Sequence, residues 1–346
     1  MAASAHPPAT EMAPFRIDPV FTARVWGFRD LRPWYDRVAE GDPIGEVWLT
    51  GDECKVATGP HTGTRLGALF SEQKVALLGT DVQVADFPAG DSPLPPGADS
   101  PLLIKTIFAR EKLSVQVHPD DAMARKYGEP RGKTECWYAL QADPGAEVAV
   151  GVKPGTTLGE IEEGIHAGTL ERSLNRIPVS VGDLIYVDAG TVHAIWPGSI
   201  LLETQQNCDL TYRMYDYGRG RELHIAKSLE ATKLVTSAGK VPPRELADRA
   251  VLIDVEYFRI ERIPVKGKIS SASLRGAGGK QGLAYLFASS GAARISGANF
   301  ELVDLPARGI VAVPAASPDF VLEEVGGAGD RLELIRITPN WPAATA

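Results

Sequence analysis

The sequence predicts a mainly β protein with two related β-sandwich or barrel domains and a helical segment inserted in the first. Glycine (35 residues) and proline (26) together exceed a sixth of the 346 residues, which favours frequent turns between short strands. β-prone runs recur on both sides of a helical middle region. A short internal repeat links the two β regions and suggests that they are built alike.

Short runs with strand composition follow one another in the N-terminal half of the chain. The clearest are "IGEVWLT" (44–50), "PLLIKTIFA" (101–109), "LSVQVH" (113–118) and "TECWYALQA" (134–142). Further strands are expected in "GDLIYVDAGTVHAI" (182–195), in "SILLETQQN" (199–207) and from about 251 to 338. The Pro-, Gly- and Asp-rich stretch 87–101 is predicted to be a loop.

Helical patterns are concentrated in the middle of the chain. In the segment of about 156–177, Thr157 and Glu160 have capping-box spacing, and apolar residues at helical spacing follow them. Shorter helices are expected within 120–127 and 222–235. These helices interrupt the β pattern of the first half and are predicted to form its insertion.

The internal repeat aligns residues 183–195 with residues 309–321 without a gap. Each copy has an apolar run, then small residues, then Thr or Ser, and then a polar side chain. The polar residue is His193 in the first copy and Asp319 in the second. The alignment therefore predicts that Asp319 takes the place of His193 in a second domain of the same kind.

Composition limits the partners and the compartment. The formal net charge of −8 argues against nucleic acid or an anionic membrane as a partner, because both favour a basic surface. No segment approaches the roughly 20 apolar residues of a membrane span. The three cysteines have no paired spacing, and residues 1–13 lack the apolar core of a signal peptide. We therefore expect a disordered leader over 1–13 and a cytoplasmic protein.

The run "KLSVQVHPDDA" (112–122) places three polar side chains on one face of a strand. Side chains alternate along a strand, so Ser114, Gln116 and His118 project together, whereas Val115 and Val117 point the other way. Taken alone, such a pattern is more often a solvated polar face opposite a buried apolar one. Other segments must decide whether these residues form a site.

Three further segments supply matching chemistry. His193 follows a Gly-containing turn, Glu135 and Lys133 share a strand face in "GKTECWYAL", and Arg213 lies in "DLTYRMYDYGR". Two histidines, a carboxylate and an amide oxygen suit Zn²⁺, Mn²⁺ or Fe²⁺ with positions left open for substrate oxygens. All six histidines lie at or before His224, so a histidine-containing metal site is expected in the first domain.

Taken in series, several segments resemble the signatures of class I mannose-6-phosphate isomerases (phosphomannose isomerases) of the short bacterial type. These segments are "RVWGFRDL", "IGEVWLTGDE", "LSVQVHPDD", "GKTECWYAL", "GDLIYVDAGTVHAI", "ILLETQQNCDLTYRMYDYGR" and "LHIAKSLE". The resemblance runs from about Phe15 to the end of the chain and is thin beyond 240. It implies a metal-dependent bicupin, that is, two jelly-roll or β-barrel domains.

The resemblance also implies a metal site and a division into domains. Position by position, it gives the metal ligands as Gln116, His118, Glu135 and His193. The metal is expected to be one Zn²⁺ per chain, with Mn²⁺ or Fe²⁺ not excluded. Residues 14–242 would form the catalytic cupin domain, and 243–346 a second cupin domain without metal ligands.

Further roles follow from the same resemblance. Arg213 matches a catalytic arginine, Lys133 the lysine before the ligand glutamate, and Ser114 a serine near the substrate phosphate. Lys133 could act as a base or could hold a hydroxyl or phosphate group. Glu203 and Asp216 are alternative proton carriers. The chain does not decide among them.

The implied activity is the interconversion of mannose 6-phosphate and fructose 6-phosphate, with a sugar phosphate as the small-molecule partner. Two alternatives stay open. Two histidines and a carboxylate on a β-barrel also describe a non-haem iron oxygenase, and the same scaffold could serve as a non-catalytic sugar-phosphate-binding protein. The sequence does not distinguish a monomer from a homo-oligomer.

Overall fold

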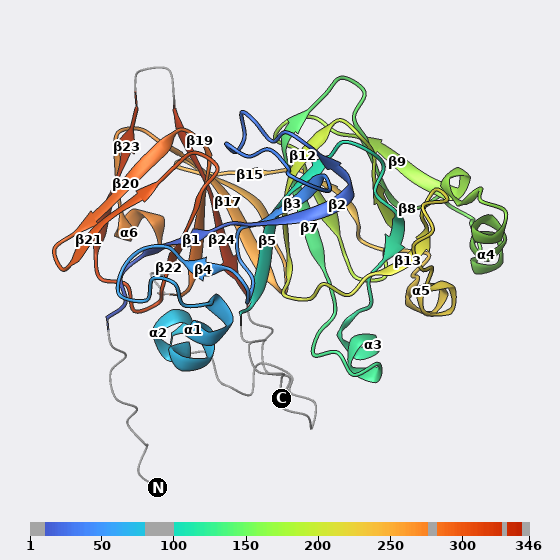
Figure 1. Ribbon diagram of the computed structural model, residues 1–346, viewed down its shortest axis with the longest axis horizontal. Helices are drawn as coiled ribbons and strands as arrows, with labels where there is room; N and C mark the ends of the chain where they lie inside the picture. The colour runs from blue at the N-terminus through green and yellow to red at the C-terminus, as the bar shows by residue number, and fades with distance from the viewer. Residues whose placement is uncertain (1–10, 80–99, 276–281, 327–330, 341–346) are drawn as a thin grey trace, which may run out of the picture.

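The computed structural model describes residues 11–79, 100–275, 282–326 and 331–340. These residues form four antiparallel β-sheets, and Figure 1 shows two β-rich halves side by side. The predicted mainly β fold is confirmed. Residues 1–10 of the predicted leader and most of the predicted loop 87–101 lie outside the described residues. Met12, by contrast, is buried in the apolar core, so the leader as predicted extends too far.

The first half pairs a seven-stranded sheet with a five-stranded sheet. The large sheet has the order β14 (Gly239–Val241), β10 (Leu184–Val187), β7 (Glu135–Ala142), β12 (Ser199–Gln206), β5 (Leu102–Ala109), β3 (Ile44–Trp48) and β2 (Val20–Phe28). The small sheet has the order β13 (Tyr212–Tyr215), β6 (Val115–Val117), β11 (His193–Ile195), β8 (Glu147–Val152) and β9 (Leu174–Pro178).

The second half pairs an eight-stranded sheet with a four-stranded sheet. The large sheet has the order β15 (Arg244–Glu245), β16 (Ala250–Asp254), β17 (Phe258–Val265), β24 (Leu332–Pro339), β19 (Ala284–Ser290), β22 (Ile310–Val313), β1 (Phe15–Asp18) and β4 (Lys55–Val56). The small sheet has the order β18 (Lys268–Ser270), β23 (Phe320–Val325), β20 (Ala292–Gly297) and β21 (Phe300–Leu305).

The two halves repeat the same strand order. The central strands of the large sheets run β10-β7-β12-β5 in the first half and β22-β19-β24-β17 in the second. The small sheets run β6-β11-β8-β9 and β18-β23-β20-β21. Strands β5 to β12 therefore correspond one to one, in chain order, with β17 to β24. This is the arrangement of a duplicated double-sheet domain.

The sequence repeat holds in one strand and fails beyond it. The apolar runs 184–187 and 310–313 form the corresponding strands β10 and β22, as the alignment predicts. In the first half, His193 pairs with Gln116, the central residue of β6. In the second half, the central residue of the corresponding β18 pairs with Leu322, so Leu322 is the counterpart of His193. The prediction that Asp319 takes the place of His193 is wrong, because the connection after β22 is longer. The Asp319 side chain is 82% exposed.

Side chains point alternately to the two faces of each strand, so the two faces of a sheet contribute to different apolar cores. On β7, Trp137 points into the core between the two sheets of the first half. The neighbouring Tyr138 points the other way, into a cluster that also contains Tyr285 of β19. The two large sheets therefore pack against each other through their outer faces. The layers run from small sheet to large sheet to large sheet to small sheet.

The helices cover the outside of the sheets. α1 (Leu66–Glu72) and α2 (Lys74–Leu78) lie close to β4, α3 (Asp121–Lys126) follows β6, and α4 (Leu158–His166) and α5 (Ile225–Ala231) lie at the outer edge of the first half (Figure 1). The short α6 (Ser271–Leu274) follows β18. Thr157 and Glu160 form the predicted capping box. Within the described residues, no helix is long and apolar enough to cross a bilayer.

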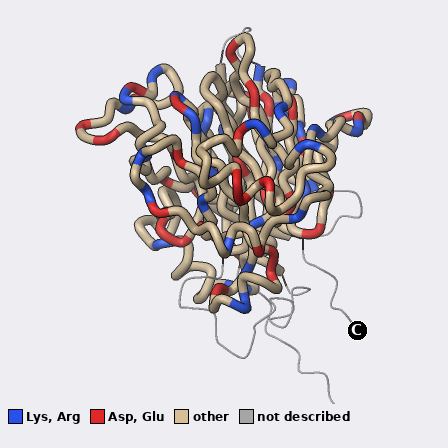
Figure 2. Tube along the Cα trace, turned by 90° about the vertical axis from the view of Figure 1, so that its right-hand side faces the viewer, with Lys and Arg blue, Asp and Glu red and all other residues tan. Residues whose placement is uncertain are grey.

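The helical insertion is shorter than the predicted segment of about 156–177. Helix α4 ends before Gly168, whose φ of 67° favours glycine and breaks the helix. A single 3₁₀ turn (Leu170–Ser173) follows, and Leu174 then begins strand β9. Figure 2 shows Lys and Arg interspersed with Asp and Glu along the Cα trace.

Candidate metal centre and active site

Three ligand-type side chains converge between the two sheets of the first half. His118 follows β6, Glu135 begins β7 and His193 begins β11, and each is 1% exposed. His118 Nε2 lies 3.6 Å from Glu135 Oε2, and His193 Nε2 lies 3.5 Å from Glu135 Oε1. One donor atom from each residue lies within 4.8 Å of the other two. The three residues could therefore hold one metal ion.

Both histidines are oriented for metal binding. His118 Nδ1 lies 2.8 Å from the Leu210 carbonyl oxygen, and His193 Nδ1 lies 2.9 Å from that of Thr191. A carbonyl only accepts, so each Nδ1 carries the proton and each Nε2 keeps its lone pair for a metal. Burial lowers the pKa of His193 to about 4, and burial together with the Lys133 charge lowers that of His118 well below its usual value. Both rings are neutral near pH 7.

Gln116 completes the group from the central position of β6. Val115 and Val117 point into the apolar cluster under the helices, which turns Gln116 toward the histidines. Its Nε2 lies 3.2 Å from His193 Nε2, and its Oε1 accepts a hydrogen bond from Ser114 Oγ at 3.3 Å. A half-turn of the amide exchanges the two atoms and presents the oxygen. Two neutral imidazoles, a carboxylate and an amide fit Zn²⁺, Mn²⁺ or Fe²⁺.

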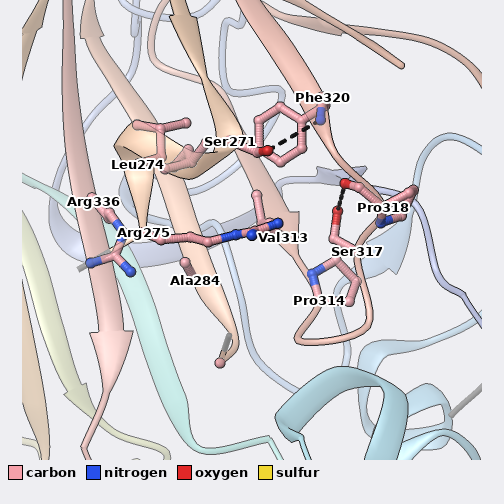
Figure 3. Close-up of a pocket in the computed structure, with 12 residues that line it drawn as sticks. Ser271, Leu274, Arg275, Ala284, Val313, Pro314, Ser317, Pro318, Phe320 and Arg336 are labelled. Atoms are coloured by element: carbon pink, nitrogen blue, oxygen red, sulfur yellow. Dashed lines mark hydrogen bonds between the residues drawn. The ribbon is translucent and has the colours of Figure 1, made fainter. Parts of the chain in front are cut away.

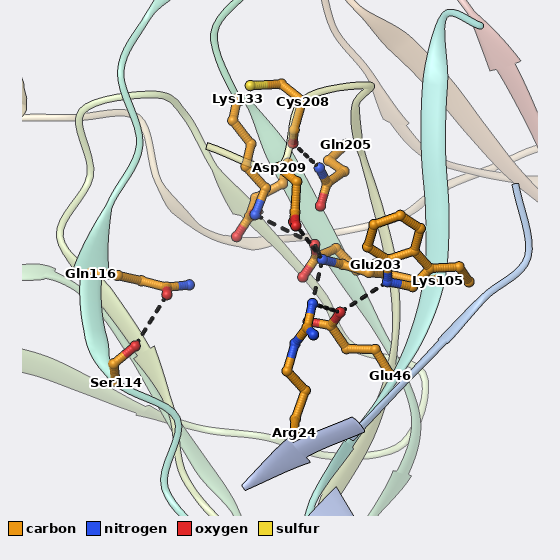
Figure 4. Close-up of polar contacts among 12 residues, drawn as sticks. Arg24, Glu46, Lys105, Ser114, Gln116, Lys133, Glu203, Gln205, Cys208 and Asp209 are labelled. Carbon is orange, nitrogen blue, oxygen red and sulfur yellow. Dashed lines mark hydrogen bonds and ion pairs between the residues drawn. The ribbon is translucent and has the colours of Figure 1, made fainter. Parts of the chain in front are cut away.

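A row of alternating buried charges runs from this group across the large sheet (Figure 4). Lys133 Nζ lies 2.9 Å from Glu135 Oε2 and 3.7 Å from Glu203 Oε1. Glu203 Oε1 lies 3.1 Å from Lys105 Nζ, which in turn lies 3.5 Å from Glu46 Oε1. Glu203 pairs with Lys105 in the strand register, so both side chains project from the same face of the sheet.

The pKa values in this row follow from burial and from the alternation of carboxylate and ammonium groups. Burial disfavours the charged Lys133, but Glu135 and Glu203 outweigh it and raise the pKa of this ammonium. Lys133 is therefore charged, which argues against the role of base in the metal-free protein. Burial and the charge of Glu135 raise the pKa of Glu203, although two lysines oppose the rise. For Glu46, burial is overcome by Lys105 and Arg24, which lower the pKa to about 2.

Arg213 lies beside Gln116 on the neighbouring strand, whereas the ion pairs that Asp216 makes within the described residues involve neither the metal group nor the charge row. Arg213 on β13 pairs with Gln116 in the strand register and donates from Nη1 to the Glu222 carbonyl at 2.9 Å. Its Nε is buried without a partner among the described residues. Asp216 instead accepts a hydrogen bond from Arg221 Nε at 2.7 Å. The structure therefore separates Asp216 from the charges around Lys133.

Sequence reasoning missed Glu46 and Arg24. Glu46 is 6% exposed and accepts from Arg24 Nη2 at 2.7 Å and from Trp48 Nε1 at 2.9 Å. A signal was present, since Glu46 interrupts the apolar strand "IGEVW" and Lys105 stands alone in "LLIKTIFA". A single charge within a fully buried strand needs a partner. The sequence alone does not show which partner it has.

Comparison with known proteins identifies the family of the chain. No protein-family model matches the chain. Mannose-6-phosphate isomerase ManA of Bacillus subtilis is 34% identical over 277 residues, covering 76% of this chain and 82% of the relative. The mannose-6-phosphate isomerase of Streptococcus mutans is 32% identical over 259 residues, covering 71% and 77%.

Solved structures support the same assignment. The crystal structure of the mannose 6-phosphate isomerase from Bacillus subtilis has a TM-score of 0.78 at 28% identity and covers 94% of this chain and 99% of that one. Phosphomannose isomerase from Salmonella typhimurium, at 15% identity, shares the fold with a TM-score of 0.72, covering 95% and 100%. By sequence and by structure, the chain belongs to the mannose-6-phosphate isomerase family.

Proposed function

We propose that the chain is a metal-dependent aldose–ketose isomerase that interconverts mannose 6-phosphate and fructose 6-phosphate. One observation carries the proposal. In a chain of this family, two neutral imidazoles and a carboxylate converge beside a buried ammonium and a second carboxylate. The oxygenase alternative is not favoured, since the relatives are isomerases.

Gln116, His118, Glu135 and His193 would hold the metal, and we propose that it is zinc. When bound, the metal supplies a Lewis acid that polarises the sugar C1 and C2 oxygens and stabilises negative charge on them. One carboxylate among four ligands leaves the site with net positive charge. Zinc accepts imidazole nitrogens and carboxylate oxygens as ligands, and the Nε2 atoms of His118 and His193 and the carboxylate of Glu135 are of these types.

The isomerisation moves a proton between C2 and C1 of the opened sugar. Glu203 suits this transfer, because burial raises the pKa of its carboxyl toward working pH. Lys133 and Arg213 stay cationic and would donate hydrogen bonds to substrate oxygens. Ser114, next to Gln116, would contact the phosphate end of the substrate. Asp216 is assigned no part in proton transfer, because Arg221 holds its carboxylate.

The organisation and location of the enzyme are part of the same proposal. Residues 14–242 would form the catalytic cupin domain, except for β1 and β4, which add to the large sheet of the second half, and 243–346 would form the second domain. The strand correspondence between the two halves supports this division. We place the enzyme in the cytoplasm, where Cys54, Cys136 and Cys208, all free and buried, would remain thiols.

The test is a coupled assay that follows conversion of mannose 6-phosphate to fructose 6-phosphate before and after treatment with a chelator. Activity should disappear with the metal and return when Zn²⁺, Mn²⁺ or Fe²⁺ is added back singly, and the ion that restores most identifies the metal. Full activity in a chain shown to be metal-free would refute the proposal. Oxygen uptake with bound iron, and no isomerisation, would favour the oxygenase.

Two matched variants assign the effect to the site. His193→Gln should lose both metal and turnover, whereas His166→Gln, at the exposed end of α4, should lose neither. Glu203→Gln should keep its metal and lose turnover by a factor of about 100 or more, the contribution of a proton-transfer group. Loss of metal from Glu203→Gln would show that Glu203 serves the metal site instead.

A further inference from the structure

The second half has a cavity of about 40 Å³ at its double sheet, and this cavity is partly open to solvent. This volume holds about three water molecules. The strand correspondence places the cavity where the first half has its metal group. Ala284 begins β19 and lines the cavity, just as Glu135 begins the corresponding β7. Gln116 on β6 pairs with His193 on β11 in the first half. At the corresponding positions of the second half, Ile269 on β18 pairs with Leu322 on β23.

The polar residues of the two positions have opposite charge. In the first half, Glu203 on β12 lies opposite Lys105 on β5, with 3.1 Å between Oε1 and Nζ. In the second half, Arg336 on β24 lies opposite Glu261 on β17, with 2.8 Å between Nη1 and Oε2. The carboxylate of Glu203 in the first half is thus replaced by the guanidinium of Arg336 at the corresponding position of the second half. A cation is therefore the wrong ligand for this cavity.

Arg336 has donors to spare. It is 8% exposed and gives Nη1 to Glu261, and none of the described residues accepts a hydrogen bond from its Nη2 or Nε. Because Arg336 lines the cavity, these donors are available to a molecule inside it. Guanidinium N–H groups that face a cavity can donate charge-assisted hydrogen bonds to an anion bound there.

A second arginine lines the same cavity. Figure 3 shows Arg275 extended across the pocket between Ser271 and Ala284. Its Nη2 lies 2.7 Å from Asp319, a carboxylate that is 82% exposed and so shares its charge with water. Among the described residues that line the cavity, none is acidic. The remaining wall is largely apolar, which strengthens any ion pair formed there.

We propose that this cavity binds a small oxyanion, through charge-assisted hydrogen bonds from Arg336 and Arg275 to a carboxylate or phosphate group. Both groups match the fork of N–H donors that a guanidinium presents. The cavity lies in the second half, away from the metal group, and a compact ion such as acetate or phosphate suits its size. The site is thus separate from the substrate site and has a different ligand.

The test is calorimetric titration of the full metal-loaded chain with inorganic phosphate and, separately, with acetate. Arg275→Ala removes one donor and should weaken binding about tenfold or more, the loss of one charge-assisted hydrogen bond. Ala284→Leu fills the cavity and should remove this binding step. Arg294→Ala is the matched control, because Arg294 also pairs with an exposed carboxylate, Asp304, in the same half.

The pattern across variants decides the outcome. Binding of either anion that weakens in Arg275→Ala and persists in Arg294→Ala supports the proposal, and the anion that binds identifies the ligand as phosphate or carboxylate. Equal binding by the parent and Arg275→Ala would overturn the proposal, as would no binding of either anion at about 10 mM. Arg275→Ala remains informative if Ala284→Leu does not fold. The readout is independent of isomerase turnover.

Discussion

Lowering the pH from about 7.5 to about 5 should destabilise the metal-free protein through His193. Burial holds the pKa of this ring at about 4 in the folded state, against 6.5 ordinarily. A group whose folded pKa is lowered contributes stability that is full above the unfolded pKa and lost as pH falls toward the folded one. At about pH 5 the unfolded chain binds nearly one more proton at this residue, which costs about 2 kcal/mol of unfolding free energy.

The assay is urea unfolding in the presence of a chelator, followed by tryptophan fluorescence at both pH values. His193→Gln keeps a polar side chain at the same place but cannot titrate, so it should lose about 2 kcal/mol less than the parent over this range. His166→Gln, exposed at the end of α4, should behave like the parent. If His193→Gln loses as much stability as the parent, the assignment of a buried, neutral His193 is wrong.

Three further changes test the fold around the site. Lys105→Met leaves Glu203 without its nearest ammonium and should lower the unfolding free energy by about 3 kcal/mol, measured by urea denaturation. Tyr257→Phe removes the hydroxyl that donates to Asp121 Oδ2 at 2.8 Å, and the same measurement should show a loss of about 1–2 kcal/mol. Thr157→Ala breaks the capping box and should destabilise α4 by about 1 kcal/mol, seen as faster amide exchange within that helix.

Local periodicity predicted the strand face from which Gln116 and His118 project together. Alternation points Val115 and Val117 into the apolar cluster under the helices, and it points Gln116 and His118 toward His193 and Glu135. This alternation depends only on the order of residues along the strand, so the sequence is enough to predict it. The position of the insertion could be predicted for the same reason, from the capping box at Thr157.

Partners that come from distant strands could not be predicted. Nothing near Glu46 indicates that Lys105 will face it, because β3 and β5 are brought together only by the completed sheet. The misplaced equivalence of Asp319 has a related cause: the length of a connection, rather than its residues, sets which residue enters the next strand. Long-range register depends on the sum of many contacts.

Strand β1 has a consequence for the order of folding during synthesis. It emerges early from the ribosome, yet it adds to the sheet of the second half, where Phe15 pairs with Ala312. At about 5–20 residues per second, some 300 residues of translation separate the two partners by roughly 15–60 s. Throughout that interval β1 can pair with β4, its other neighbour in the sheet, but not with β22. We expect a nascent chain released early to leave this segment accessible to proteases and chaperones.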